Sequence, residues 1–286
     1  MNILYIGSAG ALSLLPFRKL RSSEHVISAV GVFNPITIDN RIIALENESL
    51  ALAANQSGVP VMDLSQPVAE IIAQCSNYHI DVILMSCYGK RLQAEIIELA
   101  EKGCYNMHPS LLPRFRGPEP VFWQMKQASD MGVSWHQVEH DFDAGPVVAQ
   151  QQVVLDDGAG YSEICLQLAG YGANLVMRLL SELENDQLEL IPQDPDIASY
   201  NPYPAKKDFI IDDNLTARQL YNFMRATHAF AQPYRYKSGN LLFYLDEALD
   251  FENNITLETA EIQGDKLYIP CNEGVLIASY TDKMII

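Results

Sequence analysis

The feature that most constrains this chain is a regular alternation of short apolar runs with amphipathic stretches. The run Asp81–Ser86 is apolar on both faces, as expected of a parallel strand buried between two layers. The runs Asn2–Ile6 and Val26–Phe33 are also apolar and β-branched, and between them apolar residues recur at helical spacing from Leu12 to Leu20. Strands that alternate with helices favour βαβ units, so we expect a Rossmann-like, doubly wound, mostly parallel sheet.

The same patterns predict the remaining elements. Helices are expected over Leu45–Gln56, Ala69–Ser76, Ser162–Leu183 and Thr216–Arg225, and strands over Val59–Met62, Cys104–Asn106, Val133–Val138, Val147–Val154, Leu241–Leu245, Glu261–Ile262, Lys266–Ile269 and Gly274–Tyr280.

Four prolines between Ile191 and Pro204 predict a stiff linker. We therefore expect an α/β domain at residues 1–190, a linker at 191–205, and a small β-barrel-like (OB-like) domain at 206–286.

Composition excludes several classes of protein. The 286 residues are 48% hydrophobic and 19% charged, which is typical of a folded chain with a sizeable core. No apolar run approaches the roughly 20 residues of a membrane span, and the N-terminus lacks the pattern of a signal peptide, so a cytoplasmic protein without a membrane partner is expected. The five cysteines form no CxxC pair, which argues against a zinc site or a disulfide framework. The net charge of −17 argues against binding to nucleic acid.

Ligands of a doubly wound sheet bind beyond the carboxyl ends of its strands, and the densest polar string follows such a strand. It runs Asn106-Met-His108-Pro-Ser110-Leu-Leu-Pro113-Arg-Phe-Arg116-Gly117, and Asp143-Ala144-Gly145 follows later. In an extended segment Asn106 and His108 point the same way. An amide that stabilises an oxyanion beside an imidazole that moves a proton is suited to acyl transfer, and Asp143 could support the imidazole. An isolated Asn-x-His pair, however, is more often two loop residues that satisfy backbone groups.

The whole string resembles the formyltransferase family that includes glycinamide ribonucleotide transformylase, methionyl-tRNA formyltransferase and the amino-sugar formyltransferases. Its hallmark, Asn-x-His-x-Ser-Leu-Leu-Pro followed by Arg-Gly, is matched from Asn106 to Gly117, and the later Asp-x-Gly turn is matched at Asp143. The resemblance implies an enzyme that uses 10-formyltetrahydrofolate without a metal. It assigns catalysis to Asn106, His108 and Asp143, of which Asn106 and Asp143 would polarise the donor and organise a water.

The resemblance also implies a folate pocket, with candidate binding residues at Tyr88, Gly89, Leu92, Ser110, His136 and Gly145. His136 fits a core residue as well as a site residue. The chain departs from its relatives at Lys90 and Arg91, where apolar residues are usual. These cations fit a solvated rim as well as a contact with the carboxylates of folate.

The formyl acceptor is predicted from charge. Methionyl-tRNA enzymes carry a basic insertion where this chain has Asn34–Pro60, which holds Asp39, Glu46 and Glu48 against Arg41 alone. Residues 191–286 contain 8 Lys and Arg against 14 Asp and Glu, and many methionyl-tRNA enzymes have Met at the position of His136. A small amine, such as a nucleotide-linked amino sugar, is therefore favoured, and the alternative is methionyl-tRNA. A second alternative is a 10-formyltetrahydrofolate hydrolase, although such enzymes usually carry a regulatory domain before the position of Met1. A third alternative is a folate-binding protein without catalytic activity, but such a protein would have lost the Asn, His and Asp set, which this chain keeps at Asn106, His108 and Asp143.

Overall fold

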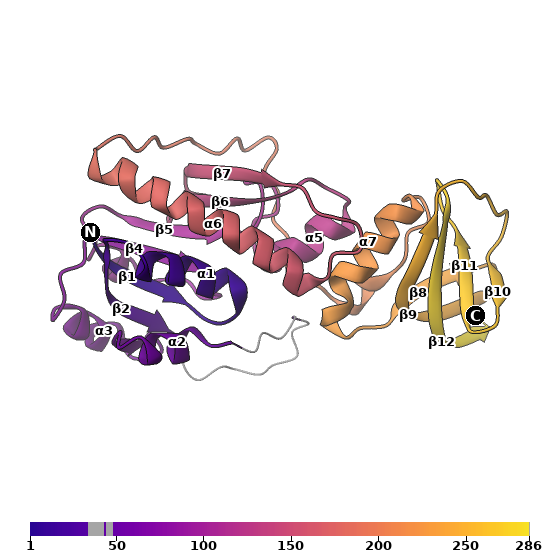
Figure 1. Ribbon diagram of the computed structural model, residues 1–286, viewed down its shortest axis with the longest axis horizontal. Helices are drawn as coiled ribbons and strands as arrows, with labels where there is room; N and C mark the ends of the chain where they lie inside the picture. The colour runs from indigo at the N-terminus through magenta and orange to yellow at the C-terminus, as the bar shows by residue number, and fades with distance from the viewer. Residues whose placement is uncertain (34–42, 44–47, 286) are drawn as a thin grey trace.

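The computed structural model describes residues 1–33, 43 and 48–285. Its first sheet has seven strands in the order β3-β2-β1-β4-β5-β6-β7 (Figure 1). The strands are β1 (Asn2–Gly7), β2 (Val26–Val32), β3 (Val61–Asp63), β4 (Val82–Ser86), β5 (Cys104–His108), β6 (Met131–Gln137) and β7 (Val147–Val153). The first five are parallel, whereas β6 runs antiparallel to both of its neighbours. The predicted doubly wound, mostly parallel sheet is confirmed.

Helices cover both faces of this sheet because its strands are apolar on both sides. They are α1 (Gly10–Arg21), α2 (Leu50–Gln56), α3 (Val68–Cys75), α4 (Ala94–Ile97), α5 (Pro120–Lys126) and α6 (Tyr161–Glu184). Ile3 and Tyr5 of β1 face a core shared with α1 and α6, whereas Leu4 and Ile6 face the core under α3 and α4. The long helix α6 packs along α1, as Figure 1 shows.

The second sheet has five antiparallel strands in the order β10-β11-β12-β9-β8. It follows α7 (Ala217–Thr227) and consists of β8 (Tyr234–Ser238), β9 (Leu241–Glu252), β10 (Glu261–Gln263), β11 (Lys266–Pro270) and β12 (Val275–Ile285). Register shifts interrupt the long β9–β12 pair, which bends the sheet as a barrel-like domain requires. The expected fold class of the C-terminal part is thus also confirmed.

Helix α5 joins the two halves of the molecule. The ring of Phe122 lies 5.1 Å from the ring of Phe209, 5.6 Å from that of Phe223 and 5.4 Å from that of Phe230, and all four side chains are buried in one core. Figure 1 shows α7 between the seven-stranded sheet and the C-terminal strands. Because α5 directly follows the loop after β5, this shared core also braces that loop.

Several boundaries differ from the expectations. The helix expected over Leu45–Gln56 begins at Leu50 among the described residues, and residues 45–47 lie outside them, as do Asp39, Arg41 and Glu46 of the acidic stretch. The strand expected over Val59–Met62 is shifted to β3, and the strand at Cys104–Asn106 continues to His108. The expected elements do not include α4 or α5, which are short and lack a clear period. They also omit β8, although its sequence Tyr-Arg-Tyr-Lys-Ser alternates as a half-buried strand does.

The proline-rich segment lies along the first sheet. Ile191 and Val147 exchange backbone hydrogen bonds of 2.8 and 2.9 Å, which extends the sheet beyond β7. Further on, the backbone of Arg116 bonds to Ser199 and Asn201, each at 2.9 Å. The segment thus reaches the loop after β5, while the domain division at 190 and 205 stays a prediction. No helix in the described part of the chain combines the length and apolarity that a bilayer span needs.

Candidate active site

The register of two antiparallel strands places the first pair of site residues together. Asn106 of β5 lies directly opposite His136 of β6, and Asn106 Nδ2 is 3.1 Å from His136 Nε2. His136 Nδ1 is 2.9 Å from the carbonyl oxygen of Gln137, which accepts only, so Nδ1 carries a proton and donates it. In neutral His136 the Nε2 lone pair therefore accepts one N–H of Asn106. His136 thus orients the Asn106 amide from the neighbouring strand β6.

His108 is the last residue of β5, and its ring, like that of His136, is held by a backbone carbonyl. Its Nε2 is 2.8 Å from the carbonyl oxygen of Phe115, so Nε2–H donates to that oxygen. In the neutral ring Nδ1 is then left as a lone pair, and it faces Asp143 Oδ1 at 3.7 Å. The His108 side chain is only 6% exposed. The loop therefore selects a tautomer whose basic nitrogen points toward the carboxylate.

Asp143 closes the group from the turn before β7. Its Oδ2 accepts a hydrogen bond of 2.8 Å from the backbone N–H of Gly117, and its Oδ1 lies 3.5 Å from His136 Nε2. Asp143 has a φ of 55°, a left-handed conformation that aspartate tolerates better than most residues. The turn thus brings the carboxylate between the two imidazoles.

Burial and charge set the protonation of this group. Burial lowers the pKa of His108 below its usual value and, together with the nearby His136, outweighs the opposite effects of the Asp143 carboxylate and the Phe115 carbonyl. Burial would raise the pKa of Asp143, but His108, His136 and the Gly117 amide hold that pKa well below its usual range. At neutral pH the site therefore contains a neutral His108 beside an ionised Asp143.

A pocket opens beside Asn106 at the carboxyl ends of the strands. Three of the residues predicted to bind folate, Tyr88, Leu92 and His136, line it. Lys90 and Arg91 line it as well, and Lys90 Nζ lies 4.9 Å from the ring centre of Phe33 while the Arg91 guanidinium lies 5.2 Å from that of Phe142. The rest of the lining is Met85, Asn106, Val138, Glu139, His140, Asp141, Phe142 and Asp143. The pocket thus has an apolar floor and a rim of mixed charge.

The other three predicted binding residues support the loops around this pocket. Ser110 is fully buried, and its hydroxyl donates to the Arg114 carbonyl oxygen at 2.9 Å. Gly145 is needed for close packing, because a Cβ there would lie 2.0 Å from the Gln137 carbonyl oxygen. Gly89 lies in the same loop as Tyr88, where a Cβ would be in ordinary contact, 3.8 Å from the Tyr203 hydroxyl. The assignment of all six residues to folate binding stays a prediction.

Gln193 is a site neighbour that the sequence pattern does not indicate. It belongs to the proline-rich segment, and its Nε2 donates to the carbonyl oxygens of Asp143 and Gly145 at 2.8 and 2.7 Å. A single glutamine in a stretch read as a linker carries no signal of its own.

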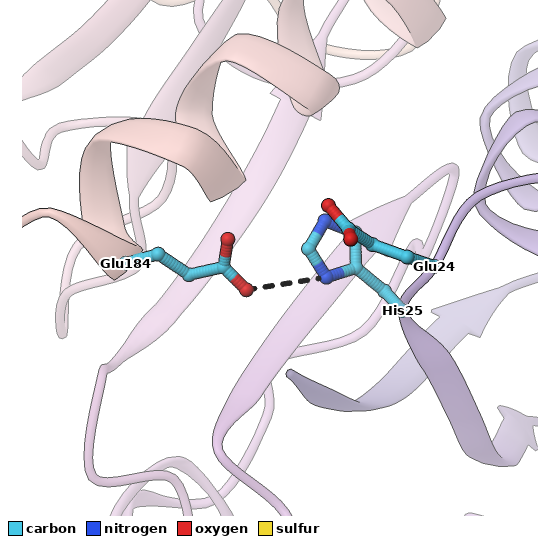
Figure 2. A group of neighbouring side chains, drawn as sticks. All are labelled: Glu24, His25 and Glu184. Carbon is cyan, nitrogen blue, oxygen red and sulfur yellow. Dashed lines mark ion pairs between the residues drawn. The ribbon is translucent and has the colours of Figure 1, made fainter.

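One group with metal-ligand chemistry lies elsewhere. Figure 2 shows Glu24, His25 and Glu184, whose ligand atoms all lie within 4.8 Å of one another. His25 Nδ1 is 3.5 Å from Glu184 Oε1, and both atoms also contact the Met1 amine, at 3.1 and 3.4 Å. Glu24 and His25 precede β2 and Glu184 ends α6, so this group lies at the end of the sheet where the parallel strands begin. It ties the start of β1 to the end of α6.

The protein combines a doubly wound sheet with an Asn, His and Asp group formed by β5 and the turn before β7, an arrangement suited to acyl transfer. Residues 1–178 match the sequence profile of the Formyl transferase family. A methionyl-tRNA formyltransferase of Herpetosiphon aurantiacus is 31% identical over 230 residues, which cover 79% of this chain and 74% of that enzyme. The chain therefore belongs to the formyltransferase family and is an enzyme of this type.

Solved structures share the fold over nearly the whole length. An N-formyltransferase from Helicobacter canadensis, solved with folinic acid and dTDP-3-aminofucose, has a TM-score of 0.71 at 16% identity and covers 97% of this chain and 98% of that one. A methionyl-tRNA formyltransferase from Clostridium thermocellum has a TM-score of 0.57 at 14% identity, with 100% and 99% covered. Both halves of the present chain thus have counterparts in single enzymes.

Proposed function

We propose that this enzyme transfers the formyl group of 10-formyltetrahydrofolate to a small primary amine, and that Asn106, His108 and Asp143 carry the reaction. The observation that supports this most strongly is the arrangement of His108. Its Nε2–H donates to the Phe115 carbonyl oxygen, and its Nδ1 faces the ionised carboxylate of Asp143 at 3.7 Å. This is how a general base is prepared to accept a proton and then be stabilised as an imidazolium.

The proposed chemistry follows from the hydrogen bonds that Asn106 and His108 can still make. Asn106 has two amide hydrogens, of which one is directed to His136, so the other is available to the formyl oxygen. As the amine attacks the formyl carbon, this amide stabilises the oxyanion and His108 takes the proton that the amine loses. The tetrahedral intermediate then collapses as the bond between the formyl carbon and N10 breaks, and the proton passes to N10. The products are a formamide and tetrahydrofolate.

A small amine is proposed as the acceptor because the chain offers little to attract a polyanion. The net charge is −17, and the pocket rim sets Glu139 and Asp141 against Lys90 and Arg91. A nucleotide-linked amino sugar suits the fold, since the Helicobacter canadensis enzyme is described with dTDP-3-aminofucose. Methionyl-tRNA is the second candidate, favoured by the sequence similarity to the Herpetosiphon aurantiacus enzyme.

The proposed compartment is the cytoplasm. None of the five cysteines, all of which are described, takes part in a disulfide, and three of them are buried. Thiols in this state suit a reducing environment.

An assay of 10-formyltetrahydrofolate consumption tests the proposed reaction. With purified protein we expect slow loss of the donor alone and a large stimulation by an accepted amine, measured with a panel of nucleotide amino sugars and with methionyl-tRNA. Equal consumption with and without amine would identify a hydrolase instead, because water would then be the nucleophile. No consumption under any condition, with folate still bound, would identify a binding protein.

A further inference from the structure

Gln193 links the loop that follows His108 to the turn that carries Asp143. We propose that Gln193 is a positioning residue for formyl transfer, whose side-chain amide clamps the turn of Asp143 to the Arg116 end of the His108 loop. This inference rests on the proposed function of His108 and Asp143. It adds a role for the proline-rich segment, which would otherwise only connect two domains.

The Gln193 amide uses its entire hydrogen-bonding capacity in this link. Its two N–H groups donate to the carbonyl oxygens of Asp143 and Gly145, at 2.8 and 2.7 Å. Its Oε1 accepts from Nε and Nη2 of Arg116, at 3.0 and 2.8 Å. An amide has two donors and two acceptor lone pairs, so all four are satisfied.

The chemistry of this position requires an amide. Two carbonyl oxygens need donors on one side, while a guanidinium needs an acceptor on the other. Glutamate would place a charge against the carbonyls of Asp143 and Gly145, and methionine has the length of Gln193 but offers neither function. Gln193 is half-buried, so water replaces these bonds only in part.

The clamp acts on the residues that determine the catalytic geometry. Asp143 adopts a left-handed conformation with a φ of 55°, and Gln193 holds the carbonyl of the peptide group that follows it and that of Gly145 further along the turn. Arg116 precedes Gly117, whose N–H fixes Asp143 Oδ2 at 2.8 Å. The Gln193 amide thus holds the Asp143 turn through the carbonyls of that turn. Through Arg116 it also holds the backbone N–H of Gly117. The distance of 3.7 Å between Asp143 Oδ1 and His108 Nδ1 depends on both of these attachments.

Other bonds hold the segment itself in place, which makes the side chain testable. Ile191 is paired with Val147, and Ser199 and Asn201 are paired with Arg116, all through backbone groups. The path of the chain therefore does not depend on the Gln193 amide. A variant that lacks the amide is expected to fold.

The test compares Gln193→Met with the same change at Gln151, an exposed residue of β7 whose amide bonds only to the next carbonyl. In Gln193→Met we expect kcat to fall by about 10- to 100-fold, since small displacements of a catalytic group cost this much. Folate affinity, measured by fluorescence titration, should be unchanged. The His108 pKa, measured by NMR of labelled imidazoles, should fall, because the carboxylate that raises it is less well placed. Gln151→Met should match wild type in all three.

A kcat within about twofold of wild type, or an unchanged His108 titration, would overturn the clamp. The His108→Ala variant separates this result from a failure of the proposed function. If His108→Ala is inactive and Gln193→Met is normal, only the clamp is wrong. If His108→Ala keeps its turnover, the proposed function is wrong. The NMR titration of His108 in Gln193→Met then still decides whether Gln193 positions Asp143 beside His108.

Discussion

At the scale of single residues, backbone carbonyls decide which nitrogen of each imidazole is basic. The Phe115 carbonyl oxygen accepts a hydrogen bond from Nε2–H of His108, and the Gln137 carbonyl oxygen accepts one from Nδ1–H of His136. The two rings therefore have opposite tautomers in their neutral forms. His136 receives an amide N–H from Asn106, whereas His108 presents its basic Nδ1 to Asp143. The two histidines differ in role because their backbone partners differ.

Replacement of the proposed base tests its role directly. We expect His108→Ala to lower turnover by on the order of 10²- to 10⁴-fold, the usual contribution of a positioned acid or base. Folate binding should survive, because the pocket lining does not include His108. His79→Ala is the matched control, since the His79 side chain is 71% exposed and pairs with Asp81 before the start of β4, whereas the pocket lies beyond the carboxyl end of that strand. Near-normal turnover in His108→Ala would refute the assignment.

The pH profile tests the carboxylate. His108 must be neutral to accept a proton, so its protonation produces the acid limb of turnover, below the usual imidazole pKa because burial lowers that of His108. The Asp143 carboxylate raises the His108 pKa. Asp143→Asn should therefore shift the acid limb to lower pH and also reduce the plateau, since the imidazolium loses its support. The measurement is kcat against pH, and an acid limb that does not move would make Asp143 a turn residue only.

At the scale of elements, the site depends on how tightly the turn before β7 packs against the end of β6. Gly145 allows this contact, because any Cβ would collide with the Gln137 carbonyl. The same turn carries Asp143, and the shared core of α5 and α7 braces the opposite loop. Site geometry is thus set by packing between elements as well as by the site residues.

Gly145→Ala should displace the turn and misplace the carboxylate. We expect kcat to fall by on the order of 10²-fold, the cost of a displacement of about 1 Å, while the free energy of folate binding changes less. The control is Gly170→Ala in the middle of α6, where a Cβ would meet nothing within 4 Å. That change should raise the free energy of unfolding by up to about 1 kcal/mol, because alanine favours a helix. Similar kcat values for both variants would show that the turn tolerates the shift.

At the scale of the whole molecule, charge bears on the choice of acceptor. The chain carries −17 overall, and residues 191–286 hold 8 basic against 14 acidic residues. Association with a polyanion depends on basic groups that replace its counterions. This charge balance is one ground for the proposal that the acceptor is a small amine and not a polyanion.

The salt dependence of turnover tests this directly. Formylation of a small amine should vary weakly with salt, since one or two charge-assisted hydrogen bonds hold such an acceptor. Methionyl-tRNA should be a poor substrate with little binding at physiological salt. Initial rates with each acceptor across a salt series provide the measurement. Efficient formylation of methionyl-tRNA that falls steeply with salt would reverse the choice of acceptor and leave the catalytic assignment intact.

The sequence by itself determined the class of fold and the core of the site. Apolar periodicity is local, so it placed most strands and helices, and the spacing of Asn106 and His108 put both side chains on one side of β5. The short helices α4 and α5 were not predicted because they lack a clear period. Tertiary structure decided the rest. His136 joins Asn106 through strand register, and Gln193 joins Asp143 from 50 residues away. Such pairings depend on which polar groups the folded chain brings together, and a local pattern contains no information about a partner that is distant in sequence.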